Sequence, residues 1–123
     1  MTTIYPDIGL VGTGAMGRGI AQIAAQAGSV VHLFDTKPEA APQARDHILA
    51  QWKRQEEKGR LPAGESDRLA QRLRIAAKLE DLAGCQLVVE AVVERLDVKQ
   101  SLFAQLEQVV AADATLATNT SSL

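Results

Sequence analysis

The chain has 123 residues, a length that suits one domain with a buried core, and its single cysteine, Cys85, excludes an intrachain disulfide. Thirteen basic and fifteen acidic residues give a net charge of −2, which argues against a general nucleic-acid binder or an anionic-membrane binder. Apolar runs fall short of the roughly 20 residues that a membrane helix needs, and with no signal peptide evident we expect a cytoplasmic protein.

Two strands flank a helix in the first part of the chain. Residues 8–11 form a short apolar run that ends in glycines, which predicts a buried strand. Residues 15–27 carry apolar side chains at helical spacing, and Gly28 stands where a helix C-cap glycine belongs. Residues 30–34 predict a second strand, which Asp35 closes.

A pair of helices is predicted next. The first is expected from about residue 39 to 58, and residues 59–64 contain the glycines and proline of a turn. Ser66 is a candidate N-cap for the second helix, and residues 73–76 predict a third strand. The apolar stripe of the first helix would consist of Ile48, Leu49 and Trp52.

The last part of the chain continues the alternation of strands and helices. Residues 79–84 form a connector with one helical turn, and residues 87–93 form a central strand with its exit loop. A helix N-capped by Asp97 and a short strand over residues 115–118 follow. This order implies a parallel sheet with helices on both faces.

Three glycines follow the first strand in the pattern G-x-G-x-x-G. Gly12 permits a tight turn, Gly14 lets a pyrophosphate approach the backbone, and Gly17 lets the helix pack close to the strand. The helix amino terminus would offer free N–H groups to the phosphates. The spacing alone is a weak signal, but here a strand precedes it and a helix follows it, as dinucleotide binding requires.

Asp35 lies eighteen residues after Gly17, close to the roughly 20 expected for a ribose-binding carboxylate. A carboxylate there accepts a hydrogen bond from the ribose 2′-OH and repels a 2′-phosphate, which favours NAD over NADP. The alternative is a glycine turn in which Asp35 serves only as a cap.

We predict an α/β fold: a Rossmann-type doubly wound parallel sheet with an inserted helix pair between strands 2 and 3, truncated before the last strand.

The crossover between the second and third strands is longer than the dozen or so residues that such a connection needs. Asp35 and Ile75 are forty positions apart. The inserted helices could form a solvated hairpin, or some of their cations could meet a phosphorylated substrate tail. The cations concerned are Arg45, Lys53, Arg54, Lys58, Arg60, Arg68, Arg72 and Arg74.

Four segments resemble one enzyme family, the 3-hydroxyacyl-CoA dehydrogenases. They are the glycine-rich opening at residues 8–21, the basic turn at 58–61, the V-V-E-A-V-V-E run at 88–94 and the T-N-T-S-S-L segment at 118–123. The likeness covers the whole chain, and the T-N-T-S-S-L segment and the basic turn are far more specific than the glycine turn. The bacterial 3-hydroxybutyryl-CoA and phenylacetate-pathway type is the most similar.

The resemblance implies an oxidoreductase of fatty acid β-oxidation that converts L-3-hydroxyacyl-CoA to 3-ketoacyl-CoA and passes hydride to NAD. Glu94 and Lys99 would lie along the nicotinamide, and Ser121 would hydrogen-bond the C3 oxygen of the substrate while it approaches the nicotinamide. Lys58 would reach the CoA nucleotide. The pyrophosphate would be held by the backbone of Gly12, Thr13, Gly14, Ala15, Met16 and Gly17, and the adenosine ribose by Asp35.

Each of these roles has a plainer alternative. Glu94 and Lys99 could be a loop residue and a surface charge, and Ser121 could cap a following helix. Glu90 interrupts an apolar run, and since a buried carboxylate needs partners we expect it to contact the backbone or the cofactor.

The family's proton-transferring histidine and glutamate follow the T-N-T-S-S-L segment, so residues 1–123 would be a cofactor-binding fragment that is inactive alone. His32, expected near the adenosine end, and His47, expected at the surface or in packing, do not replace them. The C-terminal helical domain would be absent, the full-length protein a homodimer, and the fragment able to self-associate through an open sheet edge.

Alternatives to this function are a β-hydroxyacid dehydrogenase cofactor domain and a non-catalytic NAD-binding module. We expect no metal, nucleic-acid or membrane partner.

Overall fold

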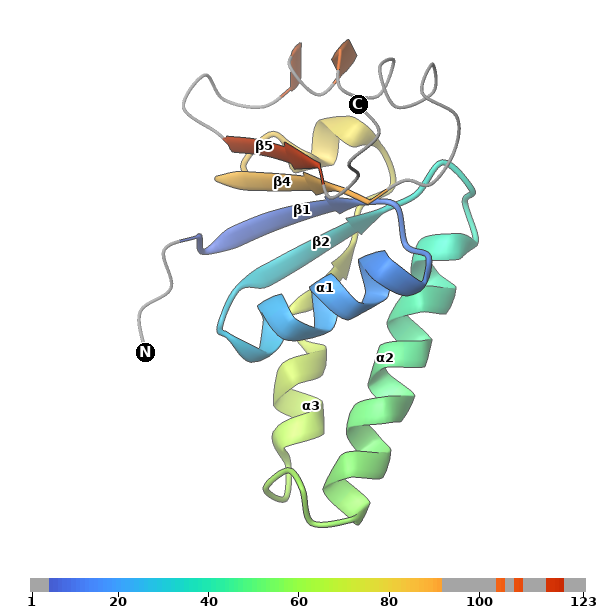
Figure 1. The fold of residues 1–123 in the computed structure, drawn as a ribbon, viewed down its shortest axis with the longest axis vertical. Helices are drawn as coiled ribbons and strands as arrows, with labels where there is room; N and C mark the ends of the chain where they lie inside the picture. The colour runs from blue at the N-terminus through green and yellow to red at the C-terminus, as the bar shows by residue number, and fades with distance from the viewer. Residues whose placement is uncertain (1–4, 92–103, 106–107, 110–114, 119–123) are drawn as a thin grey trace.

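A five-stranded parallel sheet forms the centre of the molecule (Figure 1). The computed structural model describes residues 5–91, 104–105, 108–109 and 115–118. The strand order is β3-β2-β1-β4-β5, and every neighbouring pair is parallel, as the sequence predicts. The strands are β1 (Asp7–Val11), β2 (Val30–Phe34), β3 (Leu73–Ile75), β4 (Leu87–Glu90) and β5 (Thr115–Thr118).

The predicted connecting helices are present. They are α1 (Ala15–Gln26), α2 (Ala40–Glu57), α3 (Glu65–Ala70) and the 3₁₀ turn η1 (Leu79–Leu82). Both α1 and α2 begin and end within one residue of their expected bounds. Gly28, at φ 115°, adopts a backbone conformation that suits glycine just after α1. The helix predicted behind Asp97 lies mostly outside the described residues, of which 104–105 and 108–109 are helical.

Both faces of the sheet are covered, which explains why its strands are rich in aliphatic residues. On one face, Leu10, Val31 and Leu33 pack in a cluster with buried residues of α1 and α2. On the other face, Val11 and Val88 pack in a second cluster that includes residues of η1 and Cys85. Burial raises the pKa of the Cys85 thiol to about 11, and the charge of Asp7 acts in the same direction.

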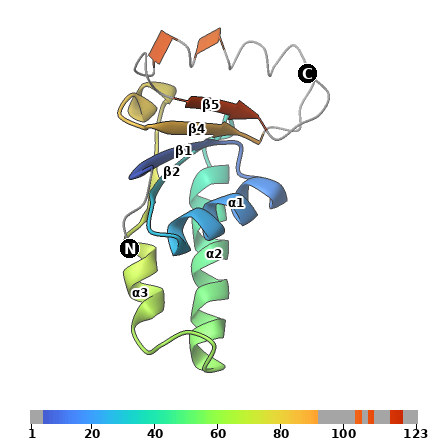
Figure 2. The same cartoon turned by 60° about the vertical axis from the view of Figure 1, so that its left-hand side comes forward.

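The inserted helices extend beyond the sheet as a two-helix arm, here called the helical arm, which comprises residues 40–70 (Figures 1 and 2). Ile48 and Trp52 of α2 are fully buried, so the predicted apolar stripe is confirmed, with Leu49 only partly buried. Arg45 joins the arm to the sheet: its Nε donates to the Leu73 carbonyl at 2.9 Å and its Nη2 to the Ala70 carbonyl at 3.0 Å.

The expectation that Ser66 caps α3 is wrong. Gly64 occupies the N-cap position with φ 84°, and Ser66 lies inside the first turn. The cap comes instead from α2, because Glu56 Oε1 accepts hydrogen bonds from Ser66 N at 3.0 Å and from Ser66 Oγ at 2.9 Å. These bonds from Ser66 lower the pKa of the Glu56 carboxyl below its ordinary value. A carboxylate also suits the positive end of the α3 dipole.

Candidate functional site

The loop between β1 and α1 and the end of β2 meet at the carboxyl edge of the sheet. The two strands are parallel, and their register pairs Val11 with Phe34, so Gly12 and Asp35 leave the sheet side by side. Gly12 N donates to the Phe34 carbonyl at 2.8 Å, which continues the sheet pairing by one residue into the loop. Parallel pairing thus places the glycine loop against the acidic residue that the sequence singles out.

Two of the three glycines have a geometric reason to lack a side chain, and the third leaves open space beside the loop. Gly12 has φ 100°, which L side chains rarely adopt. A Cβ on Gly17 would overlap the carbonyl oxygen of Gly12, so α1 packs against the loop only because the atom is missing. A Cβ on Gly14 would meet nothing within 4 Å, so the space beside this residue is open to a ligand.

Asp35 is tied to the loop by hydrogen bonds from Thr13. Its Oδ2 accepts from Thr13 N and from Thr13 Oγ1, both at 2.8 Å, while its Oδ1 accepts from Lys37 N at 3.0 Å. Partial burial by itself raises the pKa of Asp35, but these hydrogen bonds and the charge of Lys37 outweigh it and hold the pKa below its ordinary value. The carboxylate is therefore ionised at neutral pH.

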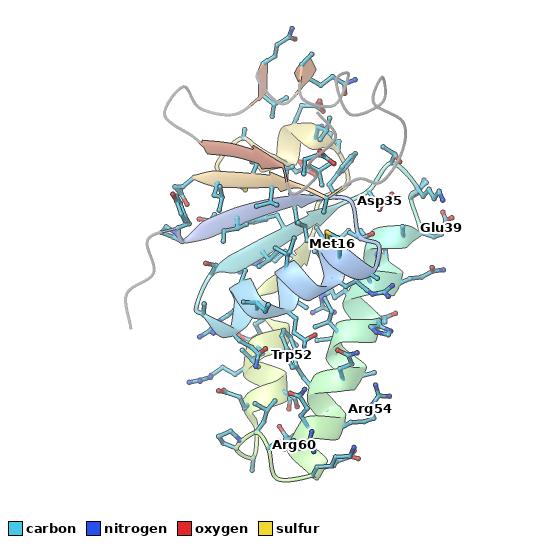
Figure 3. All side chains as sticks on the ribbon, viewed as in Figure 1. Met16, Asp35, Glu39, Trp52, Arg54 and Arg60 are labelled. Atoms are coloured by element: carbon cyan, nitrogen blue, oxygen red, sulfur yellow. The ribbon has the colours of Figure 1, made fainter. Side chains whose placement is uncertain are left out.

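A cavity of about 910 Å³ opens in front of this loop. It is lined by all but one of the predicted cofactor-binding residues that the structure describes. They are Gly12, Thr13, Gly14, Ala15, Met16 and Asp35. Gly17 does not line it, since that residue is buried behind the loop. Figure 3 shows Met16 and Asp35 at the same end of the molecule as the start of α2, near Glu39.

The first two turns of α2 form a second wall of the cavity, which the sequence analysis missed. Ala40, Gln43, Ala44 and His47 line it, together with Arg18 of α1. These α2 positions follow the i, i+3, i+4, i+7 spacing of one helix face, and this face directly after Asp35 could have signalled the wall. His47 is at the surface, as expected, and its Nε2 lies 3.2 Å from Gln51 Nε2.

Lys58 lies far from this cavity. It is the exposed C-cap residue of α2, whose 18 residues span about 27 Å from the cavity end to the turn of the arm. Arg54 and Arg60 lie at the same far end of the helical arm in Figure 3. Other arm charges are paired, with Lys53 Nζ 3.9 Å from Asp67 and Arg68 Nε 2.7 Å from Glu65, which favours the solvated interpretation for those residues.

Of the other residues singled out in the sequence, some lie outside the part of the chain that the structure describes and two lie within it. Glu94, Lys99 and Ser121 lie outside the described residues, and their roles stay predictions. Glu90 is fully buried at the end of β4, beside Val11 in the sheet. His32 is turned away from the expected adenosine end. Its Nε2 contacts Oδ1 of Asp7, the first residue of β1, at 3.0 Å, and so lies towards the amino ends of the strands.

Neither a membrane span nor a metal cluster is present in the part of the chain that the structure describes. No described helix is long and apolar enough to cross a membrane. No group of three or more His, Cys, Asp or Glu side chains is placed there to hold a metal ion.

Together these features define a dinucleotide-binding domain. The strand order, the glycine loop that leads into a helix amino terminus, and the carboxylate at the end of the next strand are its defining parts. The chain belongs to the 3-hydroxyacyl-CoA dehydrogenase family: its residues 7–123 match the family's NAD-binding domain. NAD is the cofactor of that domain, and the open space at Gly14 and the ionised Asp35 fit it.

Known proteins of this family are similar to the chain over nearly its whole length. The 3-hydroxyadipyl-CoA dehydrogenase of Escherichia coli is 41% identical over 94% of the chain and 24% of its own length. The 3-hydroxybutyryl-CoA dehydrogenase of Mycobacterium tuberculosis is 41% identical over 100% of the chain and 43% of its own length. A crystal structure of 3-hydroxybutyryl-CoA dehydrogenase from E. coli K12 superposes with a TM-score of 0.92 at 40% identity, covering 98% of this chain and 26% of that one. The chain thus spans less than half the length of these relatives.

Proposed function

We propose that the protein oxidises an L-3-hydroxyacyl-CoA to the 3-ketoacyl-CoA, with hydride transfer to NAD, and that this chain supplies the cofactor-binding half. The observation that carries the proposal is the glycine loop hydrogen-bonded to Asp35 at the rim of one cavity. The pyrophosphate would lie over the loop at Gly14 and the adenosine ribose against Asp35. NAD, when bound, would supply the hydride acceptor, and the chain's own residues would hold and orient the cofactor.

The substrate half of the site is proposed from the family alone. Glu94 and Lys99 would flank the nicotinamide, and Ser121 would bind the oxygen at C3 of the substrate. The histidine and glutamate that move the proton would come from a further domain, in keeping with relatives more than twice as long as this chain. A homodimer and a cytoplasmic setting complete the proposal, and the one buried cysteine suits a reducing compartment.

A substitution at Gly14 tests cofactor binding. The backbone of Gly14, at φ −70°, accommodates alanine, and the added methyl meets nothing within 4 Å in the protein. The Gly14→Ala chain should therefore keep the wild-type melting temperature. If the pyrophosphate lies over the loop, the methyl occupies its space, and calorimetry should show at least about a tenfold loss of NADH affinity, since a displaced hydrogen-bonding contact costs a kcal/mol or more.

Gly19→Ala is the matched control for this experiment. Gly19 is an exposed residue in the middle of α1, and its added methyl also meets open space. Alanine there should stabilise the helix by about 0.5–1 kcal/mol and leave NADH binding unchanged. If NADH binds the Gly14→Ala chain as tightly as the wild type, the cofactor does not lie over the glycine loop and the proposal fails.

Lys58 is proposed to bind the phosphates of the CoA nucleotide. It lies at the tip of the helical arm, and no ion pair among the described residues involves it. Lys58→Ala should weaken binding of free CoA to the chain about two- to fivefold, in line with the loss of one solvent-exposed ion pair of roughly 0.5–1 kcal/mol. Lys53→Ala is the control, because Lys53 is already paired with Asp67. Equal CoA binding by both variants and the wild type would remove Lys58 from the site.

A further inference from the structure

Thr13 carries a buried hydroxyl that is committed to Asp35. The residue is only 4% exposed, although its side chain is polar. Burying a hydroxyl costs free energy unless the group is hydrogen-bonded, and Thr13 Oγ1 donates to Asp35 Oδ2 at 2.8 Å. The same oxygen accepts from Thr13 N, so one residue of the glycine loop makes two contacts with one carboxylate oxygen.

The two oxygens of Asp35 are therefore not equivalent. An ionised carboxylate offers about four lone-pair positions, two on each oxygen. Both positions on Oδ2 are used by Thr13, whereas Oδ1 accepts one hydrogen bond, from Lys37 N, among the described residues. One acceptor position on Oδ1 thus remains for a ligand hydroxyl, and Asp35 and Thr13 both line the cavity.

We propose that Thr13 is a positioning residue for cofactor selection, whose hydroxyl and amide fill Oδ2 of Asp35 and direct Oδ1 to the adenosine ribose. The inference rests on the proposed binding of NAD at this loop and adds a residue that decides its specificity. Three hydrogen bonds, from Thr13 N, Thr13 Oγ1 and Lys37 N, hold the carboxylate in place, so it turns away from a 2′-phosphate less readily and keeps its charge repulsion against NADPH. With the hydroxyl removed, Asp35 is held less firmly, and it both binds the ribose less well and repels the phosphate less.

The test compares Thr13→Val, which has nearly the shape of threonine without the hydroxyl, with Thr13→Ser, which keeps the hydroxyl. For Thr13→Val we expect the dissociation constant of NADH to rise about three- to tenfold, while that of NADPH stays level or falls. The lost hydrogen bond acts on the cofactor only through Asp35, so its effect should be smaller than that of a direct hydrogen bond to a charged group. Thr13→Ser should retain the wild-type preference for NADH. A role in folding alone would weaken the binding of both cofactors equally, and that result would overturn the proposal.

An Asp35→Ala background shows whether Thr13 acts through Asp35. If it does, adding Thr13→Val to Asp35→Ala should change NADH affinity no further, because the positioned group is already gone. A further loss as large as that seen in the wild-type background would overturn the proposal.

A measurement without cofactor separates this inference from the proposed function. The hydrogen bonds from Thr13 help to lower the pKa of Asp35 against the opposing effect of burial. Carbon-detected NMR titration of the Asp35 carboxyl should therefore show a higher pKa in Thr13→Val than in the wild type or Thr13→Ser. An unchanged pKa would overturn the inference even where the wild type binds NADH. Failure of the wild type to bind NADH would overturn the proposed function itself.

Discussion

The carboxylate of Asp35 connects the cofactor site to the stability of the fold. Its hydrogen bonds from Thr13 and Lys37 join groups of the chain itself, and they favour the ionised form. The position of this residue at the end of a strand was predictable from spacing alone. Its attachment to Thr13 was not, because the G-x-G pattern specifies the glycines and leaves the residue between them open.

The pH dependence of unfolding tests this connection. The pKa of Asp35 is lowered in the folded state, so the stability it contributes is fully present above the unfolded value of about 3.9 and is lost as pH falls through the folded pKa. Asp35→Asn removes the titrating group. In urea denaturation, the gap in unfolding free energy between wild type and variant should be constant at neutral pH and narrow below about pH 4. A gap that stays the same in acid would mean that Asp35 is not held in its ionised form.

At the scale of the elements, hydrophobic periodicity predicts the regular strands and helices. The features that it does not predict arise from contacts between elements. The spacing predicts α1 and α2 because each buries one face against the sheet. The cap of α3 escaped prediction because its acceptor, Glu56, belongs to the preceding helix. The α2 wall of the cavity was missed for a different reason: the helix face that signals it was not related to the glycine loop, which the start of α2 faces in the structure.

The attachment of the helical arm through Arg45 gives a prediction at this scale. Arg45 donates to two backbone carbonyls, those of Leu73 and Ala70, and is partly buried. Arg45→Met keeps much of the side-chain volume and leaves both carbonyls without this donor. We expect a loss of about 1.5–3 kcal/mol in the free energy of unfolding, the range for hydrogen bonds to a charged group. NADH binding should persist, since Arg45 does not line the cavity.

Arg54→Met is the control for this measurement. Arg54 is exposed in the last turn of α2, where a cation interacts weakly with the helix dipole. Its replacement should change stability by no more than about 0.5 kcal/mol. Similar stability losses in the two variants would show that the arm is not held by the Arg45 contacts.

For the molecule as a whole, the strand order leaves β3 and β5 at the two edges of the sheet. The β3 edge is poorly suited to pair with another chain: it has three residues, it carries the exposed Arg74, and the Leu73 carbonyl already accepts from Arg45. The β5 strand has four uncharged residues, and among the described strands it has a neighbour, β4, on one side only. The sequence analysis expected an open sheet edge from the family resemblance and did not say which strand forms it.

An uncharged edge strand of this kind invites pairing with a second copy. Sedimentation velocity should therefore show that the chain associates as its concentration rises. Ala117→Lys places like charges on both copies at the paired edge and should shift the chain towards the monomer. Ala63→Lys adds the same charge at an exposed position in the turn between α2 and α3, at the end of the helical arm far from β5 (Figures 1 and 2), and should leave association unchanged. If both variants associate like the wild type, the contact lies elsewhere on the molecule. If the wild type stays monomeric at every concentration tested, the β5 edge is protected in the free chain.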